Sequence, residues 1–420
     1  MIPDVTAKPA RLLSLDAFRG VVIALMFLVN LSGNKAAFPD WFGHAGWNNG
    51  EHGQWLADYV FPWFLFIVGV AIPFSMSSGR GAARSTSEKI AAAFKRAVIL
   101  YFLGVVLFMA RTSMDSLDWV GTGAQAVGID GFAPKIGRAI TWGTLLHWDI
   151  LPLIALGYLL ATLLWFTPRW LQVFVVLAVL AGKAAFMPAL TDQAGLQRAA
   201  WVASRTDWEY QTKSLGWIGT GIAQGLPAMC CTVFGMWAGQ LLRSLRGPRS
   251  PDTASTSSSE TADSDRAARR GCGMLFGAGL ALVAASLVMH SLLGHRFSKD
   301  FFTSSYVLLS SGSAMALLAF MYWVIDCRGW RGGLTWWFAI MGSNALFIYM
   351  VGEVLWTMVW MRWRVLGPDG SGQVMFTALQ AHLAAMSSPA AGPWMATAIY
   401  IGIYWAASLF MHRRGIVVKV

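Results

Sequence analysis

The chain has 420 residues, of which 56% are hydrophobic and only 13% are charged, and its mean hydropathy is +0.52. Soluble proteins carry roughly a quarter charged residues, so this composition excludes a water-soluble globular protein and predicts an integral membrane protein. The formal net charge of +11 is explained by Lys and Arg side chains that hold cytoplasmic loops in place, and we expect no binding to nucleic acid.

The N-terminal block alternates polar motifs with two apolar segments. R-L-L-S-L-D-A-F-R-G (11–20) leads into the first apolar run, which ends at V-N (29–30). H-A-G-W-N (44–48) lies between this run and D-Y-V-F-P-W-F-L-F-I-V-G (58–69). No small-residue cleavage site follows the first run, so we interpret it as a retained first helix and not as a signal peptide.

Further apolar segments of about 18–25 residues recur along the chain, which is the length of a membrane-spanning helix and not of a β-barrel strand. The predicted spans are 15–33, 59–77, 94–110, 143–166, 169–187, 217–242, 272–293, 302–326, 335–361 and 393–412. The segment 371–386 is short and amphipathic, and we expect an interfacial helix there. The predicted fold class is therefore an all-α polytopic helical bundle with about ten transmembrane helices.

The two sides of the membrane differ in charge. With the N-terminus inside, the inner segments carry most of the 32 Lys and Arg residues, so we expect both termini in the cytoplasm. The Ser/Thr-rich stretch 247–270 is predicted to be a disordered cytoplasmic linker. It would divide the chain into helices one to six (1–246) and helices seven to ten (271–420).

This topology places imidazole, amide and carboxylate groups at the outer ends of the helices. His44 can act as a general base or a transient acyl carrier, because imidazole titrates near neutrality; a hydrogen-bonded loop histidine is the alternative. Asn30 could donate to a developing oxyanion or cap neighbouring backbone. His147 and Asp149, at the start of the fourth span, form a rival site, although residues two apart on a helix point in different directions.

Basic side chains gather at the inner ends. Asp16 and Arg19 are three residues apart, so an ion pair within the helix is expected. Arg19, Lys95, Arg96 and Arg243 could together hold a polyphosphate at a cytoplasmic mouth. Anchoring of the helices by the same side chains is an equally good account.

Two polar residues lie deep in predicted spans: Asn344 should bond to an adjacent helix, and Glu353 should be paired, protonated or exposed to a wet cavity. The four cysteines lie in or beside apolar runs without C-x-x-C spacing, and we expect buried free thiols, no disulfide framework and no metal site. They are Cys230, Cys231, Cys272 and Cys327. P-loop, H-E-x-x-H, G-x-S-x-G and dinucleotide motifs are missing from the sequence.

The N-terminal motifs resemble the heparan-α-glucosaminide N-acetyltransferase family of transmembrane acyltransferases. Supporting motifs are F-K-R-A-V-I-L-Y-F-L-G (94–104), T-S-S-Y-V-L-L-S-S-G (303–312), Y-W-V-I-D-C-R-G-W (322–330) and M-G-S-N-A-L-F-I-Y (341–349). The family moves an acetyl group from cytosolic acetyl-CoA to an amino sugar on the other side of the membrane. The resemblance implies that His44 is the catalytic histidine, Asn30 its polar partner, and Asp58 the acidic residue before V-F-P.

Two departures from the family pattern concern the acceptor pocket. E-H-G-Q-W is inserted after H-A-G-W-N, and G-T-L-L-H-W-D-I-L-P-L (143–153) replaces the usual G-V-L-Q-R-I pattern. We therefore expect Asn48, His147 and Asp149 to contact the acceptor, and an envelope sugar is a better candidate than a heparan fragment.

The sequence thus predicts an acyl-CoA-dependent sugar N- or O-acetyltransferase in a bacterial inner membrane. Its partners would be acetyl-CoA, a small saccharide and the lipid bilayer, and a homodimer is compatible with the resemblance. The alternative is a secondary transporter or flippase for an envelope sugar precursor, in which Glu353 and the outer histidines relay protons. A non-catalytic membrane scaffold is the third possibility.

Overall fold

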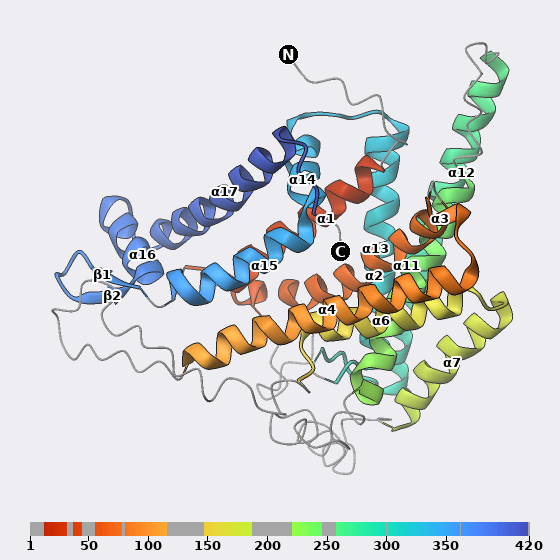
Figure 1. Ribbon diagram of the computed structural model, residues 1–420, viewed down its shortest axis with the longest axis horizontal. Helices are drawn as coiled ribbons and strands as arrows, with labels where there is room; N and C mark the ends of the chain where they lie inside the picture. Colours follow the sequence, from red (N-terminus) through yellow and green to blue (C-terminus); the bar gives the residue numbers. More distant parts are fainter. Residues whose placement is uncertain are drawn as a thin grey trace.

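In the part of the chain that it describes, the computed structural model is mostly helical (Figure 1). It describes residues 12–31, 37–43, 55–77, 80–115, 147–186, 221–245, 258–299, 301–361 and 363–418. The longer helices are α1 (Leu13–Leu31), α2 (Leu56–Ser77), α4 (Thr86–Asp115), α6 (Ile150–Trp165), α7 (Arg169–Phe186), α11 (Leu226–Ser244), α12 (Ser258–Leu293), α13 (Ser304–Met321), α14 (Gly333–Ser343), α15 (Ala345–Leu355), α16 (Met375–Met386) and α17 (Ala391–Arg413).

Shorter elements extend or connect these helices. They are the 3-10 helix η1 (Asp40–Phe42), the four-residue helix α3 (Arg80–Ala83), the π-helices η4 (Gly221–Gly225), η5 (Tyr322–Cys327) and η6 (Trp356–Trp360), and the strands β1 (Arg364–Leu366) and β2 (Gly372–Val374). The π-helices continue α11, α13 and α15 by about one turn each.

Eight helices within the described residues are long and apolar enough to cross a membrane. Helix α14 together with α15 and η6 also passes this test as a pair, but the pair is bent by 74° at Asn344, the geometry of either a broken span or a re-entrant loop. The apolar α6, with 16 residues, lies where the fourth span was predicted. The all-α polytopic membrane bundle is therefore confirmed, whereas the side of the membrane on which the termini lie stays a prediction.

Small residues allow α2 and α11 to pack with their backbones almost in contact. A Cβ atom added to Gly69 would lie 1.9 Å from the carbonyl oxygen of Thr232, and one added to Gly235 would lie 1.9 Å from that of Phe66. Glycine is required at these positions because no side chain fits between the two helices. This close packing is typical of membrane helices, which associate through dispersion and not through release of water.

In the segment 247–270, residues 258–270 form the first turns of α12, while 247–257 lie outside the described residues, so the linker between the two groups of helices stays a prediction. This helix has 36 residues, about 54 Å at 1.5 Å per residue, and its N-terminal part projects beyond the other helices (Figure 1). A polar stretch can extend a helix that already exists without the cost of nucleation.

The short segment before the last span begins as a strand and continues as a helix, and its place at the membrane interface stays a prediction. β1 and β2 pair antiparallel, with Arg364 opposite Val374 and Leu366 opposite Gly372. The 12-residue α16 follows directly and packs on α17. In Figure 1 this hairpin and α16 lie at the opposite end of the molecule from the projecting part of α12.

Candidate functional site

Asp58 lies in the first turn of α2 and is only 2% exposed. Its Oδ2 atom accepts a hydrogen bond from the backbone N–H of Trp55 at 3.1 Å. Trp55 directly precedes the helix, so this contact is the acidic half of a capping box. The carboxylate therefore both stabilises the start of α2 and adds negative charge where the helix dipole is positive.

The same turn is tied to the second half of the chain. Tyr306, which is fully buried in the first turn of α13, donates its hydroxyl hydrogen to the backbone carbonyl of Asp58 at 2.8 Å. Its ring packs edge-on against Phe302. Sequence analysis missed Tyr306 as a positioning residue, because nothing local marks a contact between residues 248 positions apart.

The other residues of the expected catalytic group are only partly described. Asn30 is the penultimate residue of α1, and it is exposed. His44 and Asn48 lie outside the described residues. Asp58 is thus the member of this group whose surroundings the structure defines in detail, and the roles of the others stay predictions.

His147 and Asp149 lie before α6 and not inside a helix, which corrects the predicted start of the fourth span. Asp149 is the N-cap residue, and its Oδ1 atom accepts the N–H of Ile150 at 2.8 Å. The His147 ring stacks on Phe108 of α4 with 3.7 Å between ring centroids. The two side chains therefore differ in direction because one caps a helix and the other packs on an aromatic ring.

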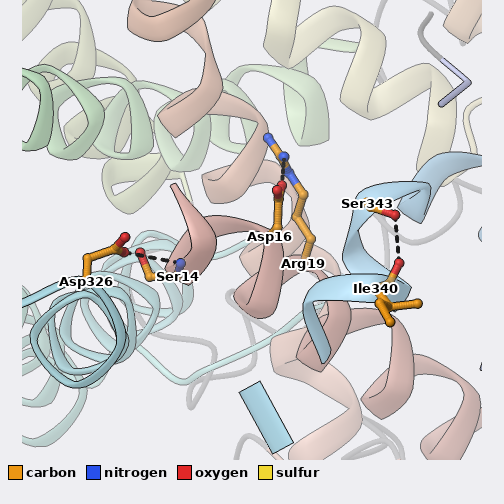
Figure 2. Close-up of polar contacts among 6 residues, drawn as sticks. All are labelled: Ser14, Asp16, Arg19, Asp326, Ile340 and Ser343. Carbon is orange, nitrogen blue, oxygen red and sulfur yellow. Dashed lines mark hydrogen bonds and ion pairs between the residues drawn. The ribbon is translucent and has the colours of Figure 1, made fainter. Parts of the chain in front are cut away.

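The motif S-L-D-A-F-R-G forms the start of α1, at the end of α1 opposite to Asn30. Figure 2 shows the polar contacts of Ser14, Asp16 and Arg19 in this motif. Arg19 donates to Asp16 at 2.9 Å, which confirms the expected ion pair, and the two side chains are 27% and 14% exposed. The backbone N–H of Ser14 donates to Oδ2 of Asp326 in η5 at 3.2 Å. A carboxylate 312 positions away along the chain thus caps the first turn of the motif.

The motif also lies in direct backbone contact with α14. A Cβ atom added to Gly342 would lie 1.8 Å from the carbonyl oxygen of Asp16, and one added to Gly20 would lie 1.9 Å from that of Phe338. In the adjoining turn, the Ser343 hydroxyl donates to the Ile340 carbonyl at 2.8 Å (Figure 2). The glycines of the two motifs are therefore explained by the contact between their helices.

The four basic residues expected to hold a polyphosphate differ in their surroundings. Arg19 is paired with Asp16, and the Arg96 guanidinium lies 5.4 Å from the ring centroid of Tyr158 on α6. Lys95 and Arg243 are exposed. Arg19 and Arg96 thus have structural partners, while Lys95 and Arg243 are accessible to an anion.

Asn344 does not bond to a neighbouring helix as predicted, but to the chain that follows α17. Its Nδ2 atom donates to the carbonyl of Ile416 at 3.0 Å, and its Oδ1 atom accepts the N–H of Val418 at 2.9 Å. Both ends of the amide are used, so Asn344 holds the C-terminal tail at the bend between α14 and α15. Glu353 is half-buried, two turns further along α15.

Lys183 is a second buried polar group, and its position inside an apolar run is visible in the sequence. Lys183 lies in the apolar run of α7, is 8% exposed, and donates to the carbonyl of Ala223 in η4 at 2.9 Å. A lysine inside an apolar run indicates a specific acceptor, but the sequence does not say which. Within the described part of the chain, no three His, Cys, Asp or Glu side chains are grouped to hold a metal ion.

Comparison with known proteins relates the N-terminal third of the chain to one set of enzymes. A family model described as a domain of unknown function (DUF5009) matches residues 11–132. Heparan-alpha-glucosaminide N-acetyltransferase of Homo sapiens is 34% identical over 132 residues, which cover 31% of this chain and 18% of that protein. The Mus musculus protein of the same name is 33% identical over 127 residues, which cover 30% and 18%.

The matched part therefore spans about a fifth of the length of these curated relatives. It is nevertheless the part that carries the S-L-D-A-F-R-G motif and Asp58. The chain is a distant relative of these proteins in this region, which confirms the resemblance of its first motif block. The resemblance of the later blocks stays a prediction.

Proposed function

We propose, from this distant relationship to glucosaminide N-acetyltransferases, that the chain is a transmembrane acetyltransferase. The identity over its N-terminal third carries the proposal. The shape of α1 supports it: 19 residues span about 29 Å, close to the ~30 Å of a bilayer core. The motif at its start and Asn30 at its end would then lie at opposite membrane surfaces.

The proposed donor is cytosolic acetyl-CoA. Lys95 and Arg243, together with Arg19 and Arg96, would bind its phosphates at the cytoplasmic mouth. The pantetheine arm would pass between the helices, so that the thioester reaches the outer half of the membrane while the charged nucleotide stays out of the lipid.

The proposed chemistry takes place at the outer ends of α1 and α2. His44 removes a proton from the acceptor amine or hydroxyl as this group attacks the thioester carbonyl, and Asn30 donates to the oxyanion. The carbon–sulfur bond then breaks, and coenzyme A leaves as a thiol after taking up a proton. Asp58, whose position is fixed by Trp55 and Tyr306, would orient the imidazole. An acetyl-imidazole intermediate and direct transfer both use these groups.

The proposed acceptor is an amino sugar or another glycan of a bacterial envelope, reached from outside the inner membrane. Asn48, His147 and Asp149 would line its entrance. The polar, hydrogen-bonding character of these three side chains suits the hydroxyl and amine groups of a sugar. A homodimer is also part of the proposal.

The test is release of coenzyme A thiol from acetyl-CoA by the purified full-length chain, with glucosamine as the acceptor. Loss of a general base costs about 10²–10⁴-fold in rate, so His44→Ala should lower turnover by this factor and leave acetyl-CoA binding unchanged. His412→Ala is the control, because His412 is exposed in the last turn of α17. Unchanged turnover in His44→Ala would remove His44 from the mechanism.

The bend at Asn344 favours one second candidate, a secondary transporter or flippase for a sugar precursor. Transporters place broken helices around their substrates, and Glu353 on α15 is a membrane-embedded carboxyl group that could carry a proton. Proteoliposomes without acetyl-CoA distinguish the two functions. A transporter would move labelled glucosamine under these conditions, whereas the acetyltransferase would not.

A further inference from the structure

The sulfur atoms of Cys272 and Cys327 lie 3.8 Å apart. Cys272 is on α12, and Cys327 is the last residue of η5, so the pair joins two neighbouring elements. Cys272 is 6% exposed, while Cys327 is only half-buried. Neither sulfur is part of a disulfide in this structure, and their separation is close to van der Waals contact.

We propose that Cys272 and Cys327 form a reversible dithiol–disulfide site. A disulfide bond has an S–S distance of about 2.05 Å, so the two sulfurs need to approach by about 1.8 Å. Rotation of the two side chains and a small movement of η5 can supply this approach, because Cys327 ends its helix. This inference does not depend on the proposed function.

The oxidant that the site would take is hydrogen peroxide. The Cys327 thiolate, as the more exposed group, attacks one peroxide oxygen, so that the O–O bond breaks, Cys327 becomes a sulfenic acid and one water leaves. The Cys272 thiol then attacks this sulfur, a disulfide forms and a second water leaves. Two thiols are oxidised by two electrons, and the peroxide is reduced to two waters.

The site is placed where it can affect the first motif of the chain. Asp326 directly precedes Cys327 and caps the first turn of α1 at Ser14. Movement of Cys327 toward α12 therefore changes the position of the Asp326 carboxylate, which accepts the Ser14 N–H at the start of S-L-D-A-F-R-G. With the predicted topology this end faces the cytoplasm, where thiols are kept reduced, so the bond would form under oxidant and be reversed by cellular thiols.

The other two cysteines provide an internal control. Cys230 and Cys231 are consecutive in α11 and both are 0% exposed. They have the same chemistry but no access to a peroxide in water. A disulfide that depends on proximity and exposure should thus form at Cys272 and Cys327 and not within this pair.

The experiment uses the reduced full-length protein in detergent, treated with hydrogen peroxide, denatured and labelled with N-ethylmaleimide. Intact mass should show that two of the four thiols no longer react, and that dithiothreitol restores them. Trypsin should release the peptides 271–296 and 300–328 as one linked species. This mapping needs only the wild-type chain, so the test does not depend on a variant that folds.

Variants then define the order of the steps. Cys230→Ala/Cys231→Ala should form the same linked peptide. Cys272→Ala should form none and should accumulate a sulfenic acid at Cys327, which dimedone traps. Four labelled thiols after peroxide, a link within Cys230–Cys231, or equal loss of label in Cys272→Ala and wild type would each overturn the proposal.

Discussion

At the scale of single residues, Asp58 has a structural role and a proposed chemical role that can be separated. Its carboxylate accepts the Trp55 N–H, while its carbonyl accepts the Tyr306 hydroxyl. Asp58 caps a helix, is buried, and lies in the matched range 11–132, so both a structural and a chemical reason could account for its acidic side chain. Substitutions that keep or remove the oxygen acceptor distinguish these reasons.

We expect Asp58→Ala to lower the free energy of unfolding by about 0.5–2 kcal/mol, because the capping acceptor is lost. Asp58→Asn keeps an oxygen that can accept the Trp55 N–H, so its stability loss should be smaller. Both variants lose the charge, and coenzyme A release should fall in both. Stability is measured by denaturant unfolding in detergent. Equal stability losses in the two variants would show that the cap is unimportant.

The charged residues at the predicted cytoplasmic side also differ in their structural roles. The Arg19 and Asp16 side chains are paired, so Arg19 is already neutralised in part. Lys95 and Arg243 are exposed and are better candidates for an incoming phosphate. Sequence spacing identified the ion pair, but exposure was needed to rank the four basic residues.

At the scale of helices, the molecule depends on glycines where two backbones meet. The contacts of α2 with α11 and of α1 with α14 leave no space for a Cβ atom at Gly69, Gly235, Gly20 and Gly342. Both contacts involve helices of the N-terminal block. The apolar sequence of α1 and α2 is therefore only part of what specifies their packing.

We expect Gly69→Ala to destabilise the protein by about 1–3 kcal/mol, the usual cost of overpacking a close contact. The matched control is Gly402→Ala in α17, where nothing lies within 4 Å of an added Cβ and alanine has the higher helix propensity. Unfolding midpoints in detergent report both changes. A Gly69→Ala variant as stable as Gly402→Ala would show that α2 and α11 are further apart than described.

At the scale of the whole molecule, contacts between distant parts of the chain hold both ends of the N-terminal block. Tyr306 of α13 fixes Asp58 at one end. Asp326 of η5 fixes Ser14 at the other. The related N-terminal third is therefore positioned by residues outside the matched region, and we do not expect it to function by itself.

The orientation in the membrane is the main prediction at this scale. The excess of Lys and Arg in the predicted inner segments places both termini in the cytoplasm. A green fluorescent protein fused after Val420 should then be fluorescent in bacteria, and alkaline phosphatase fused there should be inactive. The same phosphatase inserted in the segment 116–146 should be active. The opposite pattern would place His44 and Asn30 in the cytoplasm and would contradict transfer across the membrane.

The sequence alone determined the membrane class of the protein, the positions of its spans and the i, i+3 pairing of Asp16 with Arg19. The spans and the ion pair each depend on residues close together in the chain. Hydropathy over one window identifies a span whatever its neighbours are. The sequence also placed the candidate motifs in order along the chain, but their geometry remained open.

Only the tertiary structure decided which partners these residues have. Four contacts join residues that are far apart in sequence: Tyr306 with Asp58, Asp326 with Ser14, Asn344 with the C-terminal tail, and Cys272 with Cys327. Hydropathy does not determine these pairings, because in lipid every apolar helix face is an equally good surface for packing. The choice is made by backbone fit at a few glycines and by the need of each buried polar group for a hydrogen-bond partner.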